Sequence, residues 1–290
     1  FDEFHERRLA SDLSLARVLD VQEGSRSDLK VFVMSATLET VELLDYLKPC
    51  ELLEAGGRMY PVEIVYQPPP APRRGKQGAM ESIPVWEQVG TACRSELKAL
   101  REWKESGAGN GPRILIFLPG AFEIRRTVEL LERSSWSRGW EIKPLYSGLS
   151  PTAQTEAVSP GKAPRIIVAT NVAETSITID GVAAVIDSGL VRMASYDSRR
   201  AIDTLTVGKV SQASAQQRAG RAGRTGPGRC VRLWSERDHA RRPGFEQPEV
   251  HRIDLSEAVL YLKSGGVGEI REFRWLDVPA EESLRRAEHL

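Results

Sequence analysis

The chain has 290 residues, of which 41% are apolar and 28% are charged, a composition typical of a globular protein with about two domains. Forty basic and forty acidic residues give a net charge of zero, so bulk charge neither supports nor excludes nucleic-acid binding. No apolar run approaches the ~18 residues of a membrane span. Three isolated cysteines without Cys-x-x-Cys spacing argue against a zinc site and favour a reducing, cytoplasmic location.

The first 58 residues combine an acidic opening, a helix and a short apolar run. Asp2-Glu3-Phe4-His5 opens the chain, and apolar residues at helical spacing follow over residues 9–21. The β-branched run Lys30–Met34 then predicts a buried strand, which ends at Ser35-Ala36-Thr37. This order indicates a helix followed by one strand of a sheet.

Residues 81–238 alternate helices with short apolar strands. A helical pattern over residues 83–104 ends at a glycine cluster. Short apolar strands separated by helices then indicate a parallel sheet covered on both faces, so we expect an α/β fold of the doubly wound kind. The expected strands are 113–118, 141–146, 165–169, 183–187 and 229–234, with helices at 122–132 and 153–158.

Three further segments surround this alternation. Residues 59–80 contain a strand-like stretch, Val62–Tyr66, and a proline-rich basic part, so they are expected to be a linker. Two extended stretches joined by a polar turn predict a β-hairpin near 191–207. Helical spacing over Asp254–Lys263 indicates that a small helical domain occupies residues 239–290.

Three polar segments carry candidate chemistry. Adjacent carboxylates such as Asp2 and Glu3 can divide the work of holding Mg²⁺ and activating water, although such pairs are commoner on solvated surfaces. Guanidinium groups three residues apart in Gln217–Arg224 can neutralise phosphate charge; the alternative is an arginine-rich surface helix. Hydroxyl and amide side chains that follow the strand 165–169 can bind phosphates or act as ordinary helix caps.

Together these segments resemble the motifs of DEAH-box helicases, in their usual order. Asp2-Glu3-Phe4-His5 is similar to motif II and Ser35-Ala36-Thr37 to motif III. Phe117–Gly120, Thr170–Gly181 and Gln217–Arg224 are similar to motifs IV, V and VI. Details before and after motif VI resemble the bacterial HrpA/HrpB branch of the family, so the resemblance covers essentially the whole chain.

The resemblance implies an ATP-dependent RNA helicase or translocase that uses ATP or another NTP, Mg²⁺ and RNA, with DNA as an alternative substrate. It implies RecA-like sheets, with residues 1–58 ending a first lobe, 81–238 forming a second lobe and 239–290 starting a winged-helix-like domain. The implied site residues are Asp2 (Mg²⁺ through water), Glu3, His5, Gln217, Arg221 and Arg224 for catalysis, Ser35 and Thr37 for coupling, Ser176, Thr178 and Asp180 for the nucleotide, and Gly120, Thr170 and Asn171 for the nucleic acid.

One motif of such motors does not occur in these 290 residues. No Gly-x-x-x-x-Gly-Lys-Ser/Thr segment is present, and this phosphate loop cradles the triphosphate in related enzymes. We therefore expect a fragment that does not turn over nucleotide alone. Two alternatives stay open, namely a non-catalytic nucleic-acid-binding or regulatory fragment and a DNA-directed helicase.

Overall fold

The chain forms two compact units in a computed structural model that describes residues 1–36, 40–57, 60–71, 73–74, 80–102, 111–174 and 177–289. The sheet unit comprises Gly56–Arg192 and Val207–Phe245, and the helical unit comprises Phe1–Ala55, Met193–Thr206 and Glu246–Leu290. In these described ranges, no helix combines the length and apolar character that crossing a membrane requires. Thr37 and Ser176 lie outside the described residues.

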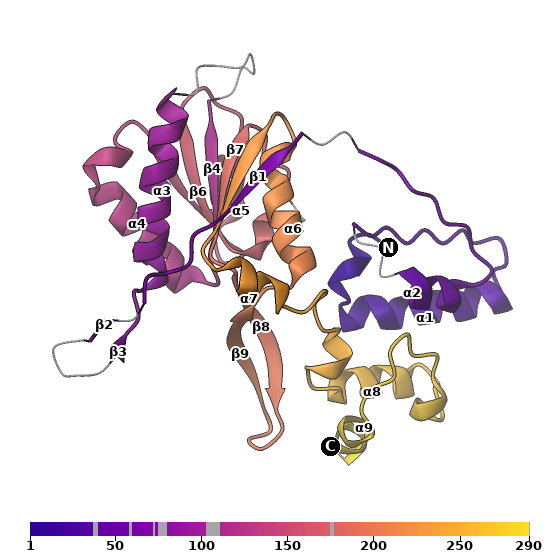
Figure 1. Ribbon diagram of the computed structural model, residues 1–290. Coiled ribbons are helices and arrows are strands. Elements are labelled where there is room, and N and C mark those ends of the chain that lie inside the picture. Colours follow the sequence, from indigo (N-terminus) through magenta and orange to yellow (C-terminus); the bar gives the residue numbers. More distant parts are fainter. Residues whose placement is uncertain are drawn as a thin grey trace. The chain divides into compact units, whose positions relative to one another are not determined.

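Parallel strands form the centre of the sheet unit, in the order β1-β10-β7-β4-β6-β5 (Figure 1). All five strands expected within residues 113–234 are present, so the parallel α/β sheet is confirmed. The range 59–80, expected to be a linker, contains β1, which pairs with β10 and is therefore part of the sheet. The strands are β1 (Val62–Tyr66), β4 (Arg113–Phe117), β5 (Glu141–Leu145), β6 (Arg165–Ala169), β7 (Val182–Asp187) and β10 (Gly228–Arg232), with a separate short pair, β2 (Arg73–Arg74) and β3 (Met80–Glu81).

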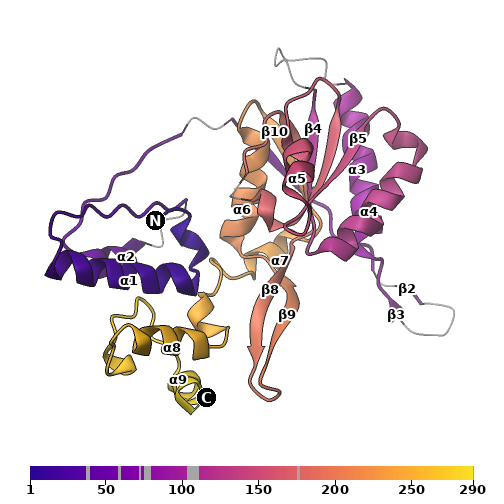
Figure 2. The same ribbon diagram turned by 180° about the vertical axis from the view of Figure 1, so that it is seen from behind.

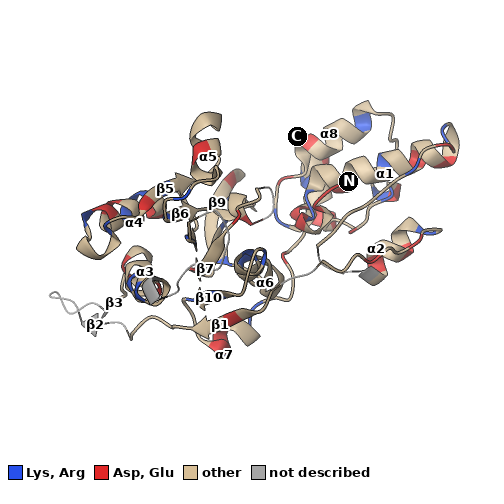
Figure 3. Cartoon of the chain, turned by 90° about the horizontal axis from the view of Figure 1, so that it is seen from above, with Lys and Arg blue, Asp and Glu red and all other residues tan. Residues whose placement is uncertain are grey.

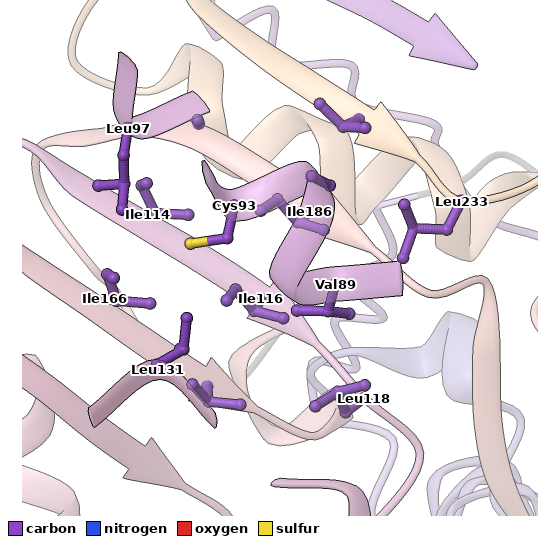
Figure 4. Packing of buried hydrophobic residues seen from close by; sticks show 14 of the residues in the cluster. Val89, Cys93, Leu97, Ile114, Ile116, Leu118, Leu131, Ile166, Ile186 and Leu233 are labelled. Atoms are coloured by element: carbon purple, nitrogen blue, oxygen red, sulfur yellow. The ribbon is translucent and has the colours of Figure 1, made fainter. Parts of the chain in front are cut away.

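Helices cover both faces of this sheet, because successive side chains of a buried strand point to opposite faces. Ile114 and Ile116 of β4 pack with α3 and α4 on one face (Figure 4). Leu115 and Phe117 pack with α5 and α6 on the other, and Figures 1 and 2 show the two pairs of helices from opposite sides. The helical elements are α3 (Val85–Glu102), α4 (Ala121–Arg133), α5 (Pro151–Val158), α6 (Gln212–Gly220), α7 (Glu236–Ala240) and the 3-10 turns η2 (Ser135–Ser137), η3 (Asn171–Ala173) and η4 (Arg221–Gly223).

The expected hairpin is confirmed by β8 (Leu190–Asp197) and β9 (Ile202–Lys209), which form a two-stranded sheet of their own. At its turn, Asp197 Oδ1 accepts the backbone N–H of Arg199 at 3.0 Å. Because β8 begins three residues after β7 ends, the hairpin starts at the carboxyl edge of the parallel sheet.

The helical unit joins the two ends of the chain in one core. Leu9 and Leu13 of α1 share a buried cluster with Val250, Leu255 and Leu284, which lie more than 200 residues later in the sequence. Both expected helical segments, at 9–21 and 254–263, are confirmed. The elements are η1 (Phe4–Glu6), α1 (Leu9–Gly24), α2 (Thr40–Leu47), η5 (Glu249–His251), α8 (Ser256–Ser264), η6 (Ile270–Glu272) and α9 (Glu281–His289).

The predicted buried strand at Lys30–Met34 is wrong. This segment is extended and exchanges backbone hydrogen bonds with residues 1–4, such as Met34 N to Phe1 O at 2.8 Å, but it forms no regular strand. Phe32 is 68% exposed and Met34 is 54% exposed. The apolar pattern is typical of a buried strand, but a buried strand must be packed on both faces. The described residues do not cover the face that carries Phe32.

Candidate functional site

The acidic segment of the helical unit is organised by His5. Ala36 donates its backbone N–H to His5 Nδ1 at 3.3 Å, so the imidazole proton belongs on Nε2, which lies 3.5 Å from Glu3 Oε2. Asp2 is exposed, and its Oδ1 accepts the backbone N–H of Glu3 at 2.9 Å. His5 therefore connects the predicted acidic motif to the segment that contains Ser35.

Glu3 has an unusual backbone conformation. Its φ of 51° lies in the left-handed region, which costs a residue with a side chain roughly 1–2 kcal/mol. The neighbouring Phe4 is 2% exposed and fixes this turn in the core. Strain of this kind is held in place by surrounding packing, and Arg7 in the same turn has a similar φ of 46°.

In the sheet unit, Gly120, Thr170 and Asn171 come together at the carboxyl edge. Leu118 donates its N–H to Ala169 O at 2.8 Å, so the segments that follow β4 and β6 run side by side. A Cβ atom on Gly120 would lie 2.9 Å from Cζ of Arg192, so a side chain there would displace the Arg192 guanidinium. Asn171 is exposed and Thr170 is half-buried, so these three predicted nucleic-acid residues share one edge.

Thr178 and Asp180 lie at the opposite edge, before the start of β7. Both side chains are exposed, and the adjacent Gly181 O accepts the N–H of Arg113, the first residue of β4. The described parts of segment 171–181, residues 171–174 and 177–181, thus lie between the carboxyl edge and the amino edge of the sheet. Five strand residues at about 3.3 Å each separate the two edges by roughly 16 Å.

Motif VI occupies α6 and η4, and its arginines have different environments. Arg218 is 1% exposed and donates to Glu174 Oε2 and Asp187 Oδ1, both at 2.9 Å. Burial lowers the pKa of the Arg218 guanidinium, but the Asp187 and Glu174 carboxylates outweigh this effect and hold it above its ordinary value. Its guanidinium carbon also lies 4.9 Å from the ring centroid of Phe117. Arg218 is therefore a charged part of the core.

Arg221 is also buried, at 2% exposure. Its Nε donates to the Glu174 carbonyl at 2.8 Å and its Nη1 to the Ile177 carbonyl at 2.6 Å. Arg224 is exposed and Gln217 is half-buried. The alternative of an arginine-rich helix on a solvated surface is therefore wrong for this segment, because the first two arginines fasten the middle of segment 171–181.

Several of these contacts were not anticipated. Arg218, Glu174 and Asp187 form a buried ion-pair group that the motif comparison left without roles. A signal for it exists in the sequence, since Asp187 ends an apolar strand, and a carboxylate buried there requires a basic partner. Gly223 of motif VI admits a close neighbour. A Cβ at this position would lie 2.7 Å from Tyr60 O, so a backbone takes that space.

The comparisons with known proteins agree with this arrangement. Residues 96–226 match the helicase conserved C-terminal domain. The chain is 36% identical over 98% of its length to the ATP-dependent RNA helicase HrpA homolog of Haemophilus influenzae, of which it covers 20%. It is 38% identical over 99% of its length to the probable ATP-dependent RNA helicase DHX34 of Homo sapiens, of which it covers 24%.

The Escherichia coli ATP-dependent RNA helicase HrpB is 38% identical over the whole chain, which covers 33% of that protein. A crystal structure of E. coli DEAH/RHA helicase HrpB matches 99% of this chain with a TM-score of 0.82 and 38% identity, over 34% of the solved chain. The chain thus spans between a fifth and a third of the length of these curated relatives. Over almost its full length, the chain is thus similar to part of these DEAH/RHA helicases.

Proposed function

We propose that this chain serves an NTP-dependent RNA helicase or translocase, which couples hydrolysis of ATP or another NTP to movement along nucleic acid and its unwinding. The observation that supports it best is segment 171–181, which extends between the two groups of predicted ligand-binding residues. Arg218 and Arg221 hold Glu174 in its middle through side chain and backbone. Such a fastened segment suits a motor in which events at the two edges must be linked.

The carboxylates near the start of the chain suit Mg²⁺ that is shared with a nucleotide. Within the described ranges, no three His, Cys, Asp or Glu side chains gather as a protein-only metal site. Mg²⁺ is usually held by one or two carboxylates together with water and phosphate oxygens, and bound Mg²⁺ neutralises charge on those phosphates. Asp2 would hold it through water, while Glu3, oriented by His5, accepts a proton from the attacking water.

The remaining predicted residues act on the nucleotide and on its coupling to movement. Arg224 is exposed and acts as an arginine finger, and Gln217 of the same motif also faces the triphosphate. Arg221 faces the triphosphate as a second finger while its guanidinium also holds Glu174 and Ile177. Nucleotide sensing is assigned to Ser176, Thr178 and Asp180, and coupling to Ser35 and Thr37.

Gly120, Thr170 and Asn171 bind the nucleic-acid backbone at the carboxyl edge. Backbone contacts position a strand without reading its bases, which suits a motor that acts on many sequences. RNA is proposed as the substrate because the named relatives are RNA helicases. The three free thiols support the expected cytoplasmic location.

The assignment of the arginines is tested in a polypeptide that joins a phosphate loop to these residues. Arg224→Ala and Arg221→Ala are each expected to lower turnover about a thousandfold, as for arginine fingers. Arg285→Ala is the matched control, because that side chain is 63% exposed on α9 and has no proposed role. Losses under about tenfold in both finger variants would contradict the assignment.

Residues 1–290 alone are expected to show negligible NTP turnover, since their sequence contains no phosphate loop. A non-catalytic binding fragment would also show negligible turnover. The polypeptide with a phosphate loop separates the two hypotheses, because only the motor would then hydrolyse NTP. Robust turnover by residues 1–290 that disappears in Glu3→Gln would overturn the expectation. Binding to single-stranded RNA and DNA of equal sequence over a salt series then identifies the substrate, because only RNA offers the 2′-OH.

A further inference from the structure

An aromatic group lies on the surface where α3 and α4 begin. Phe122, in the first turn of α4, is 49% exposed. Its ring meets the half-buried Trp86 edge to face, with the ring centroids 5.7 Å apart and the planes at 83°. The guanidinium carbon of Arg126, one helical turn after Phe122, lies 5.6 Å from the centroid of the Trp86 ring.

This group is continuous with the edge that holds the predicted nucleic-acid residues. Phe122 follows Gly120 by two residues, so their Cα atoms are no more than about 7 Å apart. The segment after β4 that contains Gly120 runs beside the segment after β6 that contains Thr170 and Asn171. A strand whose backbone contacts these three residues therefore passes within reach of the Phe122 ring.

The charges around this group favour stacking over phosphate binding. Arg126 is paired with Glu129 at 3.1 Å, and Arg192 lies 3.8 Å from Glu123. Basic and acidic side chains are interspersed along α4 (Figure 3), so no strong positive field is present on this helix. An exposed ring that packs on a second aromatic ring offers instead the stacking surface on which proteins hold unpaired bases.

We propose that Trp86, Phe122 and Arg126 form a stacking site for one unpaired base of a single-stranded nucleic acid. This inference rests on the proposed function, because it adds a base contact to the edge that is assigned to the backbone. Phe122 provides the exposed ring, Trp86 packs against that ring edge to face, and the Arg126 guanidinium lies over the Trp86 ring. Every base has a π-face, so the site accepts a base without selecting its identity.

The test measures binding of fluorescently labelled oligouridine to residues 1–290 by fluorescence anisotropy. Phe122→Leu keeps an apolar side chain but removes the ring, and it is expected to weaken binding roughly five- to a hundredfold, the value of one base stack. Phe122→Tyr keeps the ring and is expected to bind within about twofold of the unchanged chain. The salt dependence of binding should be the same in all three proteins, because no phosphate contact is removed.

An oligonucleotide with abasic sites in place of its bases provides the second arm. The unchanged chain should lose affinity for it, and Phe122→Leu should add no further loss, because the contact is already missing. Equal binding of oligouridine by Phe122→Leu and the unchanged chain would overturn the stacking site and leave the proposed function intact. An equal loss in Phe122→Tyr and Phe122→Leu would also overturn it. Failure of the unchanged chain to bind oligouridine would overturn both proposals.

Discussion

Removing the charge of Arg218 tests whether the buried ion-pair group stabilises the sheet unit. Arg218→Met keeps much of the aliphatic volume but leaves Asp187, which is 0% exposed, without its basic partner. The backbone N–H of Gly189, at 2.8 Å from Asp187 Oδ1, remains as a donor to this carboxylate. Breaking one side of a buried ion pair costs about 3–5 kcal/mol, so we expect the free energy of unfolding to fall by that amount.

Urea unfolding followed by far-ultraviolet circular dichroism measures this loss as a change in the midpoint. Arg224→Met is the matched control, since Arg224 is exposed in the same motif, and it should change the free energy of unfolding by no more than about 0.5 kcal/mol. The double variant Arg218→Met/Asp187→Leu should recover part of the loss, because it removes the fully buried Asp187 carboxylate together with its partner, although Glu174 still loses Arg218. A loss below about 1 kcal/mol for Arg218→Met, or a double variant whose loss equals the sum of both single losses, would refute the reasoning.

Two further predictions concern the same unit. Gly223→Ala should lower the free energy of unfolding by about 1–3 kcal/mol, because the added Cβ would lie 2.7 Å from Tyr60 O. Gly226→Ala is the control, since no atom lies within 4 Å of its Cβ. Equal melting temperatures of the two variants would contradict this prediction. Burial and two nearby arginines lower the pKa of His239 below its ordinary 6.5, so the unfolded chain takes up a proton there before the folded chain does. The free energy of unfolding should therefore fall as the pH drops below about 6.5. His239→Phe should weaken this pH dependence, as measured by urea titrations between neutral and mildly acidic pH. If the free energy of unfolding of His239→Phe changes with pH as steeply as that of the unchanged chain, His239 is not the source of the dependence.

The strands of the sheet unit could be predicted from the sequence because each carries its own signal. Val62–Tyr66 and Arg165–Ala169 have the predicted bounds, since both are short apolar runs between turn residues. The expected strand at Lys30–Met34 carried the same signal, but pairing and burial depend on neighbours that a local pattern does not contain. The local sequence pattern therefore predicts that a strand exists better than it predicts which other residues pair with the strand and bury it.

The candidate site was predictable to the extent that its chemistry is local. Motif order identified Arg221 and Arg224 together, yet one is buried on backbone carbonyls and the other is exposed. Residue spacing does not predict this difference, because side chains three residues apart eclipse in a 3-10 turn such as η4. The difference comes from the neighbouring segment, whose Glu174 and Ile177 carbonyls accept hydrogen bonds from Arg221.

The double attachment of Glu174 limits how segment 171–181 can move. Its carboxylate is held by Arg218 and its carbonyl by Arg221, and Arg218 is itself fixed on Asp187 at the end of β7. A displacement that begins at Asn171 must therefore either shift α6 with the segment or break charge-assisted hydrogen bonds inside a packed core, where intermediate positions are poorly tolerated. Such a group favours discrete arrangements over gradual deformation. Arg218 thus has a physical consequence for the proposed motor, and Arg221 adds a second hold on Glu174 besides its proposed role at the triphosphate. Together they determine whether the two edges of the sheet move together.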